Sequence, residues 1–228
     1  MPVIDPSARV HASADLEDDV SVGGASSIDR RAQVRSGARI GRETTVGRDV
    51  LIDAAVVIGD RVRILDRALI YHGVTVEDAV YIGPAAILTN DRYPRAITSA
   101  GEVTGAGDWT ISPVVLRHGC SIGAGAVVVA GSDVGRFATV GAGAVVTRGV
   151  PGHALVVGSP AHRIGWVCAC GSRLRDSNGN PAPAKIERYA TDPILACGAC
   201  GRGYAYVPDE DSLSERRPAR APQQVGAP

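Results

Sequence analysis

The feature that most constrains this chain is an aliphatic residue at every sixth position. The register is unbroken from Ile4 to Leu88, pauses for one segment and resumes from Leu116 to Val146, so that 21 positions agree without a miss. An α-helix repeats every 3.6 residues and an ordinary strand every two, so neither explains a period of six. The pattern predicts a coil that turns a corner every six residues.

A second column of small residues supports the same register. The residue four positions after each aliphatic is Ala, Ser, Thr, Cys or Val, with Arg92 as the one exception, and Gly often follows the aliphatic directly. We interpret the chain as a triangular prism. Aliphatic side chains fill its interior, small residues form its wall near the corners, and Gly or polar residues make its turns. Three hexads close a coil of 18 residues, and successive coils stack as parallel strands about 4.8 Å apart. The predicted fold class is all-β.

The periodicity fails between Leu88 and Leu116. This segment contains three Gly, two Pro and Trp109. Long irregular loops inside compact folds usually bind something. We therefore predict an extruded loop over about 89–115 that carries part of a functional site.

Several motifs, taken together, resemble the hexapeptide-repeat acyltransferases, and among them the nucleotide-sugar N-acetyltransferases. These motifs are VYIGP at 80–84, TNDRYPR at 89–95, PVVLRHG at 113–119, GAGAVVT at 141–147 and VVGSPAHRIG at 156–165. The resemblance implies a left-handed parallel β-helix over residues 1–165 and a homotrimer in which the loop reaches a neighbouring subunit. It also implies acetyl-CoA as donor and a UDP- or dTDP-linked 3-amino sugar as acceptor.

The resemblance implies catalytic and substrate-binding residues near the loop. The family's Asn of the TN segment contacts the sugar's amino group, which corresponds to Asn90. His72 lies 18 residues earlier, one coil away, so its side chain is expected beside Asn90, where an imidazole could accept the amine proton. Water and the departing CoA thiolate are the alternative proton acceptors. Tyr71 and Arg95 are the predicted substrate-binding residues, Arg95 because a guanidinium suits a diphosphate or carboxylate.

The acetyl-CoA site is predicted on the last coils. Gly-rich turns can present backbone N–H groups and bare walls to pantetheine, and the family places the adenosine end near the VVGSPA loop. The predicted cofactor-binding residues are Gly123, Ala124, Gly141, Ala142, Arg148 and Arg163.

Beyond Gly165 the hexads cease, and four cysteines occur as two closely spaced pairs. Cys168 and Cys170 form the first pair, and Cys197 and Cys200 form the second, with 26 residues between the pairs. Four thiolates suit a tetrahedral Zn²⁺ site with closed coordination, hence a structural metal. Disulfides are the alternative, although they are rare in the cytosol. We predict a zinc-ribbon-like module over 166–207, followed by a disordered tail over 208–228 that is polar and Pro-rich.

Composition limits the remaining classes. The chain has 24 basic and 24 acidic residues and a formal charge of zero, so no nucleic-acid partner is expected. The start lacks a signal-peptide pattern and no apolar stretch reaches spanning length, so a cytoplasmic protein without membrane contact is expected.

Four other functions remain as alternatives. An O-acetyltransferase acting on a sugar or other small hydroxyl substrate is the main one, and acyl groups larger than acetyl are another. A carbonic-anhydrase-like metalloenzyme would require three converging histidines. A non-catalytic scaffold would have little need of the loop.

Overall fold

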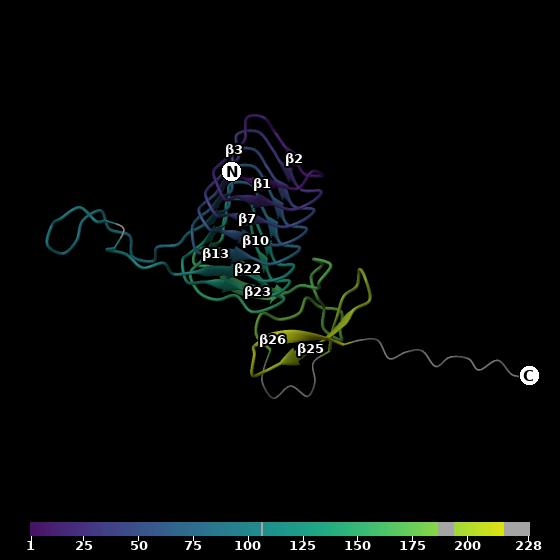
Figure 1. The fold of residues 1–228 in the computed structure, drawn as a ribbon. Coiled ribbons are helices and arrows are strands. Elements are labelled where there is room, and N and C mark those ends of the chain that lie inside the picture. Colours follow the sequence, from purple (N-terminus) through teal and green to yellow (C-terminus); the bar gives the residue numbers. More distant parts are fainter. Residues whose placement is uncertain (106, 187–193, 217–228) are drawn as a thin grey trace, which may run out of the picture.

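The computed structural model describes residues 1–105, 107–186 and 194–216, and it is a stack of coils with a small module at its end (Figure 1). The N-terminus lies at one end of the stack and the cysteine module at the other, while residues 91–111 project sideways as an arm. Strands and turns make up the described residues, which include no helical segment of the length and apolar character that a bilayer crossing requires.

Three sheets form the sides of the prism, and up to β21 each is parallel and contains every third strand of the chain. Sheet A contains β1 (Val3–Ile4), β4 (Ser21–Val22), β7 (Arg39–Ile40), β10 (Val57–Ile58), β13 (Val74–Val76), β16 (Val114–Leu116) and β19 (Asp133–Val134). Sheet B contains β2 (Arg9–Val10), β5 (Ser27–Ile28), β8 (Thr45–Val46), β11 (Arg63–Ile64), β14 (Tyr81–Ile82), β17 (Ser121–Ile122), β20 (Thr139–Val140), β22 (Ala154–Val157) and β23 (His162–Trp166). Sheet C contains β3 (Asp15–Leu16), β6 (Gln33–Val34), β9 (Leu51–Ile52), β12 (Leu69–Ile70), β15 (Ile87–Leu88), β18 (Val127–Val128) and β21 (Val145–Val146).

The strand register follows the 18-residue coil. Ile70 pairs with Leu88 in sheet C, 18 positions later, and neighbouring coils repeat this offset. Across the arm, Val76 pairs with Leu116 instead, an offset of 40 that contains 22 inserted residues. The all-β parallel coil with an extruded loop is therefore confirmed.

The aliphatic column forms the core. From Val22 to Val146 every sixth aliphatic is at most 3% exposed, whereas Ile4 at the open N-terminal end is 39% exposed. Burial of one such side chain stabilises the fold by about 1.5–3 kcal/mol relative to leaving it in water. Because each coil covers the next, the column is buried only where coils lie on both sides.

The corners differ from the prediction. The turn residue with positive φ stands three positions after the aliphatic, as at Ala25, Arg31 and Glu43, and not at the Gly that follows it. That Gly is required by close approach instead: a Cβ on Gly41 would lie 2.5 Å from the backbone carbon of Gly59 in the next coil. Gly therefore permits tight stacking of coils, while the turns themselves accept many residue types.

The end of the chain also differs from the prediction. β22 and β23 form an antiparallel hairpin that closes sheet B, and β24 (Ile194–Ala196), β25 (Gly203–Val207) and β26 (Ser212–Arg216) form a separate antiparallel sheet. The predicted disordered tail over 208–228 is thus wrong for residues 208–216, because β26 pairs along the whole of β25. The rest of that prediction, 217–228, lies outside the described residues.

Candidate active site and metal centre

The corner that follows sheet C carries the predicted catalytic residues. The pairing of Ile70 with Leu88 places Tyr71 and His72 on the coil next to Thr89 and Asn90, and the Tyr71 N–H donates to the Leu88 carbonyl at 3.2 Å. This strand register places His72 and Asn90 at equivalent positions of adjacent coils. Both side chains are half-buried.

His72 has a defined tautomer. Its Nδ1 lies 2.6 Å from the carbonyl oxygen of Ala54, one coil away, and its backbone N–H donates to Asp53 at 3.2 Å. A carbonyl only accepts, so Nδ1 carries a proton, and the tautomer that fits this contact has its lone pair on Nε2. Nε2 is thus the atom of His72 that could accept a proton from a substrate.

The arm leaves and rejoins the coil at this same corner. The Ser112 N–H donates to the Asn90 carbonyl at 2.9 Å and closes the root of the arm. Arg92, the residue that breaks the small-residue column, donates through Nη1 to the Ala130 carbonyl at 3.0 Å. Ile111 covers Gly73, where a Cβ would lie 2.5 Å from its Cγ2. The root of the arm is therefore fastened beside His72 and Asn90.

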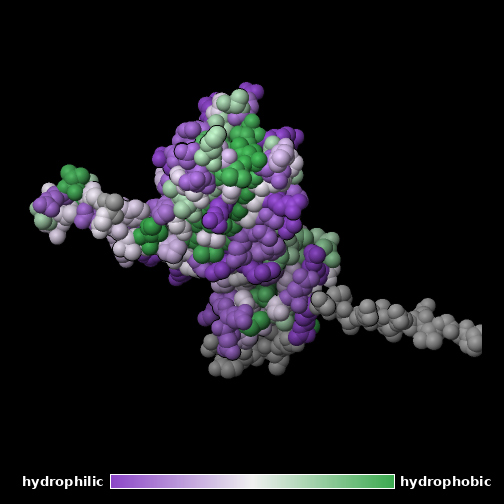
Figure 2. Space-filling model, in the orientation of Figure 1, coloured by the Kyte–Doolittle hydropathy of each residue, from purple (hydrophilic) through white to green (hydrophobic). Residues whose placement is uncertain are grey.

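The arm contains a cavity of about 630 Å³ whose lining includes Asn90, Arg95 and Trp109. Arg95 is exposed and donates to the carbonyl of its neighbour Pro94 at 2.8 Å. Figure 2 shows apolar surface near the tip and the root of the arm, where Ile97, Val103 and Ile111 are exposed. The structure thus brings Arg95 to one cavity with Asn90, and it leaves apolar side chains of the arm uncovered by the rest of the chain.

The predicted pantetheine wall lies at another corner. Gly123, Ala124, Gly141 and Ala142 follow strands of sheet B, so they border the opposite edge of sheet C from His72 and Asn90. A Cβ on Gly123 would lie 2.4 Å from the Ala142 nitrogen, so this wall is bare because coils stack closely there. Within one chain, the width of sheet C separates this wall from the catalytic corner.

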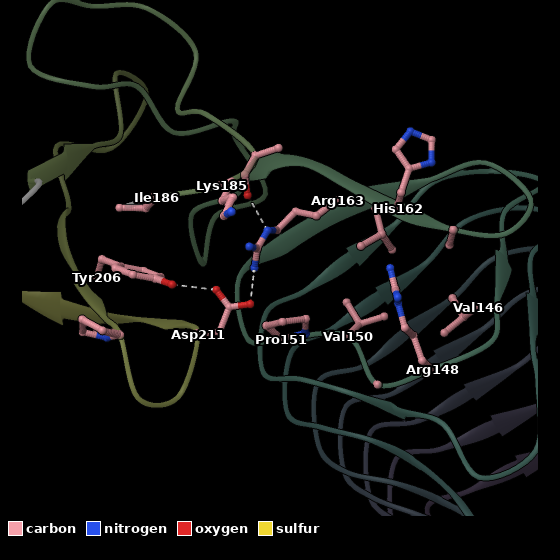
Figure 3. Close-up of a pocket in the computed structure, with 15 residues that line it drawn as sticks. Val146, Arg148, Val150, Pro151, His162, Arg163, Lys185, Ile186, Tyr206 and Asp211 are labelled. Carbon is pink, nitrogen blue, oxygen red and sulfur yellow. Dashed lines mark hydrogen bonds and ion pairs between the residues drawn. The ribbon is translucent and has the colours of Figure 1, made fainter. Parts of the chain in front are cut away.

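Arg148 and Arg163 line a pocket of about 900 Å³ between the last coil and the cysteine module, which we call the junction pocket (Figure 3). Arg148 occupies the same hexad position as Asn90, two coils further on. Arg163 is engaged by the module: its Nε donates to the Ala184 carbonyl at 2.5 Å, and its Nη1 contacts Asp211 at 3.0 Å. Its guanidinium also lies 4.2 Å from the ring centre of Trp166. Of the two, Arg148 has the freer charge for a ligand phosphate.

The four predicted metal ligands come together. The sulfur atoms of Cys168, Cys170, Cys197 and Cys200 all lie within 4.8 Å of one another, with pairs at 3.5 and 3.6 Å. Zn–S bonds of about 2.3 Å in a tetrahedron would hold sulfurs about 3.8 Å apart, so the cluster fits zinc. All five cysteines of the chain are free thiols.

Hydrogen bonds around the cluster favour thiolates. Backbone and side-chain hydrogen bonds from Ser172 lower the pKa of Cys170 to about 6. The Arg202 N–H lowers the pKa of Cys200, whereas burial raises the pKa of Cys168 to about 11. A bound cation would overcome the burial of Cys168, because metal coordination deprotonates a thiol.

Several residues at these sites had no signal in the sequence. Tyr204 approaches Cys168, while Lys185 and Asp211 line the junction pocket. None belongs to a motif: Tyr204 lies on β25, and Lys185 and Asp211 lie outside the strands. Only the proximity of Tyr204 to Cys200 along the chain could have drawn attention to it.

Comparisons with known proteins give a partial match to one curated enzyme and matches to several solved structures. No family model matches the chain. A segment of 61 residues is 43% identical to the dTDP-3-amino-3,6-dideoxy-alpha-D-galactopyranose 3-N-acetyltransferase of Aneurinibacillus thermoaerophilus, and it covers 27% of this chain and 32% of that enzyme. The chain thus matches about a third of the length of this curated relative.

Similar solved structures are acetyltransferases. The acetyltransferase domain of PglB from Neisseria gonorrhoeae, in complex with acetyl coenzyme A, is 23% identical with a TM-score of 0.43, over 72% of this chain and 57% of that one. PerB from Caulobacter crescentus, in complex with CoA and GDP-perosamine, is 22% identical with a TM-score of 0.39, over 72% and 56%. The hexad register, the three-sided coil and the segment shared with the Aneurinibacillus enzyme confirm the predicted resemblance to the hexapeptide-repeat acyltransferases.

Proposed function

We propose that this chain is an acetyl-CoA-dependent N-acetyltransferase that acetylates the amino group of a nucleotide-linked amino sugar. The 3-amino group of a UDP- or dTDP-sugar is the proposed acceptor. The observation that carries the proposal is the segment of 61 residues that is 43% identical to a dTDP-3-amino-sugar 3-N-acetyltransferase. The stacking of His72 with Asn90 at the root of the arm supports it, because the corner offers both an amide and an imidazole to an amine.

The proposed reaction is direct attack of the amine on the thioester. The side-chain oxygen of Asn90 accepts a hydrogen bond from the amine and orients its lone pair toward the carbonyl carbon of acetyl-CoA. The new C–N bond forms as His72 Nε2 takes a proton from the nitrogen. The C–S bond then breaks, and the CoA thiolate leaves and receives that proton from the imidazolium.

The donor is proposed to lie along the last coils. Arg148 and Arg163 at the junction pocket are the proposed neighbours of the adenosine end, with Arg148 as the phosphate contact. The bare wall at Gly123, Ala124, Gly141 and Ala142 is the proposed pantetheine site. Since this wall and the catalytic corner border opposite edges of sheet C, one active site would use the wall of one subunit and the corner of the next.

A homotrimer is therefore part of the proposal. The outward positions of sheet C are aliphatic in five successive coils, whereas sheets A and B carry Ser, Thr, Arg and Asp at many of these positions. The five residues are Leu51, Leu69, Ile87, Val127 and Val145. A continuous apolar stripe on a sheet favours burial against another protein surface, and a second copy of the chain is the proposed partner.

Zinc at the four cysteines is proposed as a structural ion. Cys168, Cys170, Cys197 and Cys200 would fill all four positions of a tetrahedral site, which leaves none for an activated water. In that role the metal would hold the two cysteine turns together and take no part in acetyl transfer.

A thiol-release assay with acetyl-CoA tests the activity. We expect turnover with one or more UDP- or dTDP-linked 3-amino sugars and none with the matched 3-hydroxy sugars, because only the amine fits direct attack without a strong base. Turnover of the hydroxyl analogues alone would show an O-acetyltransferase instead. No thiol release with any member of the panel would contradict the proposal.

Two variants test the catalytic corner. Asn90→Ala is expected to lower kcat/KM by about 100-fold, because the amine loses its alignment. Replacing His72 with Ala should lower kcat and remove an inflection from its pH profile. Asn178→Ala and His11→Ala, in exposed turns away from the corner, are the matched controls. Unchanged kinetics in Asn90→Ala would remove this residue from the mechanism.

A further inference from the structure

The cysteine module is packed into the last coil of the prism. Trp166, Leu174, Leu195, Tyr204 and Leu213 are buried in the same hydrophobic cluster as the aliphatic column of the coils. Trp166 and Tyr204 are completely buried. The four-cysteine site therefore belongs to a continuous core and not to a tethered appendage.

Tyr204 connects the cysteine cluster to the coil. Its hydroxyl lies 3.1 Å from the sulfur of Cys168 and accepts the Ala169 N–H at 3.0 Å. Because a thiolate can only accept, the Tyr204 hydroxyl donates its one proton to Cys168. Its oxygen meanwhile accepts from Ala169, so the hydroxyl is hydrogen-bonded in both roles. The ring stands 4.9 Å from that of His153, whose Nδ1–H donates to the Val167 carbonyl at 3.0 Å.

Strand β25, which carries Tyr204, reaches the junction pocket two residues later. Tyr206 follows Tyr204 on one face of β25, and its hydroxyl donates to Asp211 at 2.8 Å. The other oxygen of Asp211 contacts Arg163 (Figure 3). The Arg163 guanidinium in turn lies over the Trp166 ring. A chain of contacts thus runs from the sulfur of Cys168, through Tyr204 and β25, to the wall of the pocket formed by Tyr206, Asp211 and Arg163.

We propose that metal binding at the four cysteines builds this wall of the junction pocket, with Tyr204 as the positioning residue that joins the two sites. Metal at Cys168 fixes the Tyr204 hydroxyl, and the strand then holds Tyr206 and Asp211 against Arg163. By linkage, whatever binds in the formed pocket also strengthens the metal site. The inference rests on the proposed zinc binding and not on the acetyl transfer reaction, so the thiol-release assay and the experiment below can fail separately.

Trp166 is a built-in reporter of this wall. The sequence has two tryptophans, so Trp109→Phe in the full chain leaves Trp166 as the single emitter. Zinc is removed with a chelator, and the released metal is quantified with a colorimetric dye. Trp166 emission and amide hydrogen exchange are measured before and after its removal. We expect one zinc per chain and a red shift of Trp166 emission when zinc is removed. Amide protection should be lost in 162–166 and 203–207 and kept in the coils of residues 20–88 and 114–146.

Readdition of zinc should reverse these changes, and readdition of magnesium should not. Unchanged emission and protection in the metal-free chain would overturn the proposal. Unfolding of the whole coil stack would also overturn it, because the metal would then support the entire fold and not the junction. A chain that binds no zinc would overturn it as well.

Two tyrosines of β25 form a matched pair of variants. Tyr204→Phe keeps the ring against His153 but removes the hydroxyl, and it should weaken zinc binding by about 10- to 100-fold, as outer-shell partners of metal ligands do. Tyr206→Phe should weaken zinc binding much less, because it touches only the far end of the linkage, and should alter Trp166 emission at full zinc occupancy. Equal zinc affinities in the two variants would remove Tyr204 from its positioning role.

Discussion

At the scale of single residues, the wall of the prism contains two buried serines in the same hexad position. The hydroxyl of one is hydrogen-bonded and that of the other is not. Ser26 donates to the Gly41 carbonyl at 2.7 Å and accepts the Thr44 N–H at 2.9 Å. Ser132 is equally buried, and its hydroxyl is the one buried side-chain polar atom without a partner among the described residues. A buried polar group stabilises a fold only if its hydrogen bonds are made.

The two serines should therefore respond differently to Ala. Ser26→Ala is expected to lower the free energy of unfolding by about 1–3 kcal/mol, because two buried backbone groups lose their partner. Ser132→Ala is expected to be neutral or slightly stabilising, within about 0.5 kcal/mol. Denaturant unfolding measures both values. Equal destabilisation by the two changes would contradict the hydrogen-bond assignment.

At the scale of elements, the junction between the last coil and the module depends on a neutral histidine. Burial lowers the pKa of His153 below its usual 6.5, while the Val167 carbonyl and Glu215 oppose this shift and Arg136 adds to it. The unfolded chain therefore binds more protons than the folded one just below pH 6.5. The stability of the junction is complete above that pH and falls as the pH drops toward the lowered pKa.

His153→Gln tests this dependence, because its amide can still donate to Val167 but does not titrate. The fall in thermal midpoint between pH 7.5 and 5.5 should be smaller in this variant than in the wild type. Acid also releases metal from thiolates, so both proteins are compared in the same buffers. His11→Gln, in an exposed turn, should behave as the wild type. If the thermal midpoint of His153→Gln fell as much as that of the wild type, His153 would not be the titrating group.

At the scale of the whole molecule, the outward stripe of sheet C is the proposed interface between subunits. Leu69 is half-buried in the middle of this stripe, whereas Val57 is 42% exposed on sheet A. Leu69→Lys would place a charge inside the proposed interface, where an unpaired charge is strongly unfavourable. Val57→Lys makes the same change on a different side of the prism.

Sedimentation equilibrium should give the wild type and Val57→Lys three times the 23.5 kDa mass of one chain. Leu69→Lys should give a smaller species and lose activity, because the wall at Gly123 and the corner at Asn90 would no longer meet across subunits. Assembly that is lost in Val57→Lys and kept in Leu69→Lys would place the interface on sheet A instead.

The repeat by itself determined the coil, its 18-residue register and the place where the register fails. These follow from the sequence because each hexad makes the same local turn, so the pairing of Ile70 with Leu88 is a matter of counting. The same counting placed His72 beside Asn90, and the paired cysteines indicated their cluster.

Only the tertiary structure decided the rest, because a period fixes which residues share a position but not their backbone angles or contacts, and the cysteine module has no period. It located the positive-φ turn residue three positions after the aliphatic and assigned Gly41 to close stacking. It showed that the wall at Gly123 and the corner at Asn90 lie on opposite edges of sheet C. It also brought Asp211 to Arg163 and Tyr204 to Cys168, through the packing of β25 and the turn after it against the last coil.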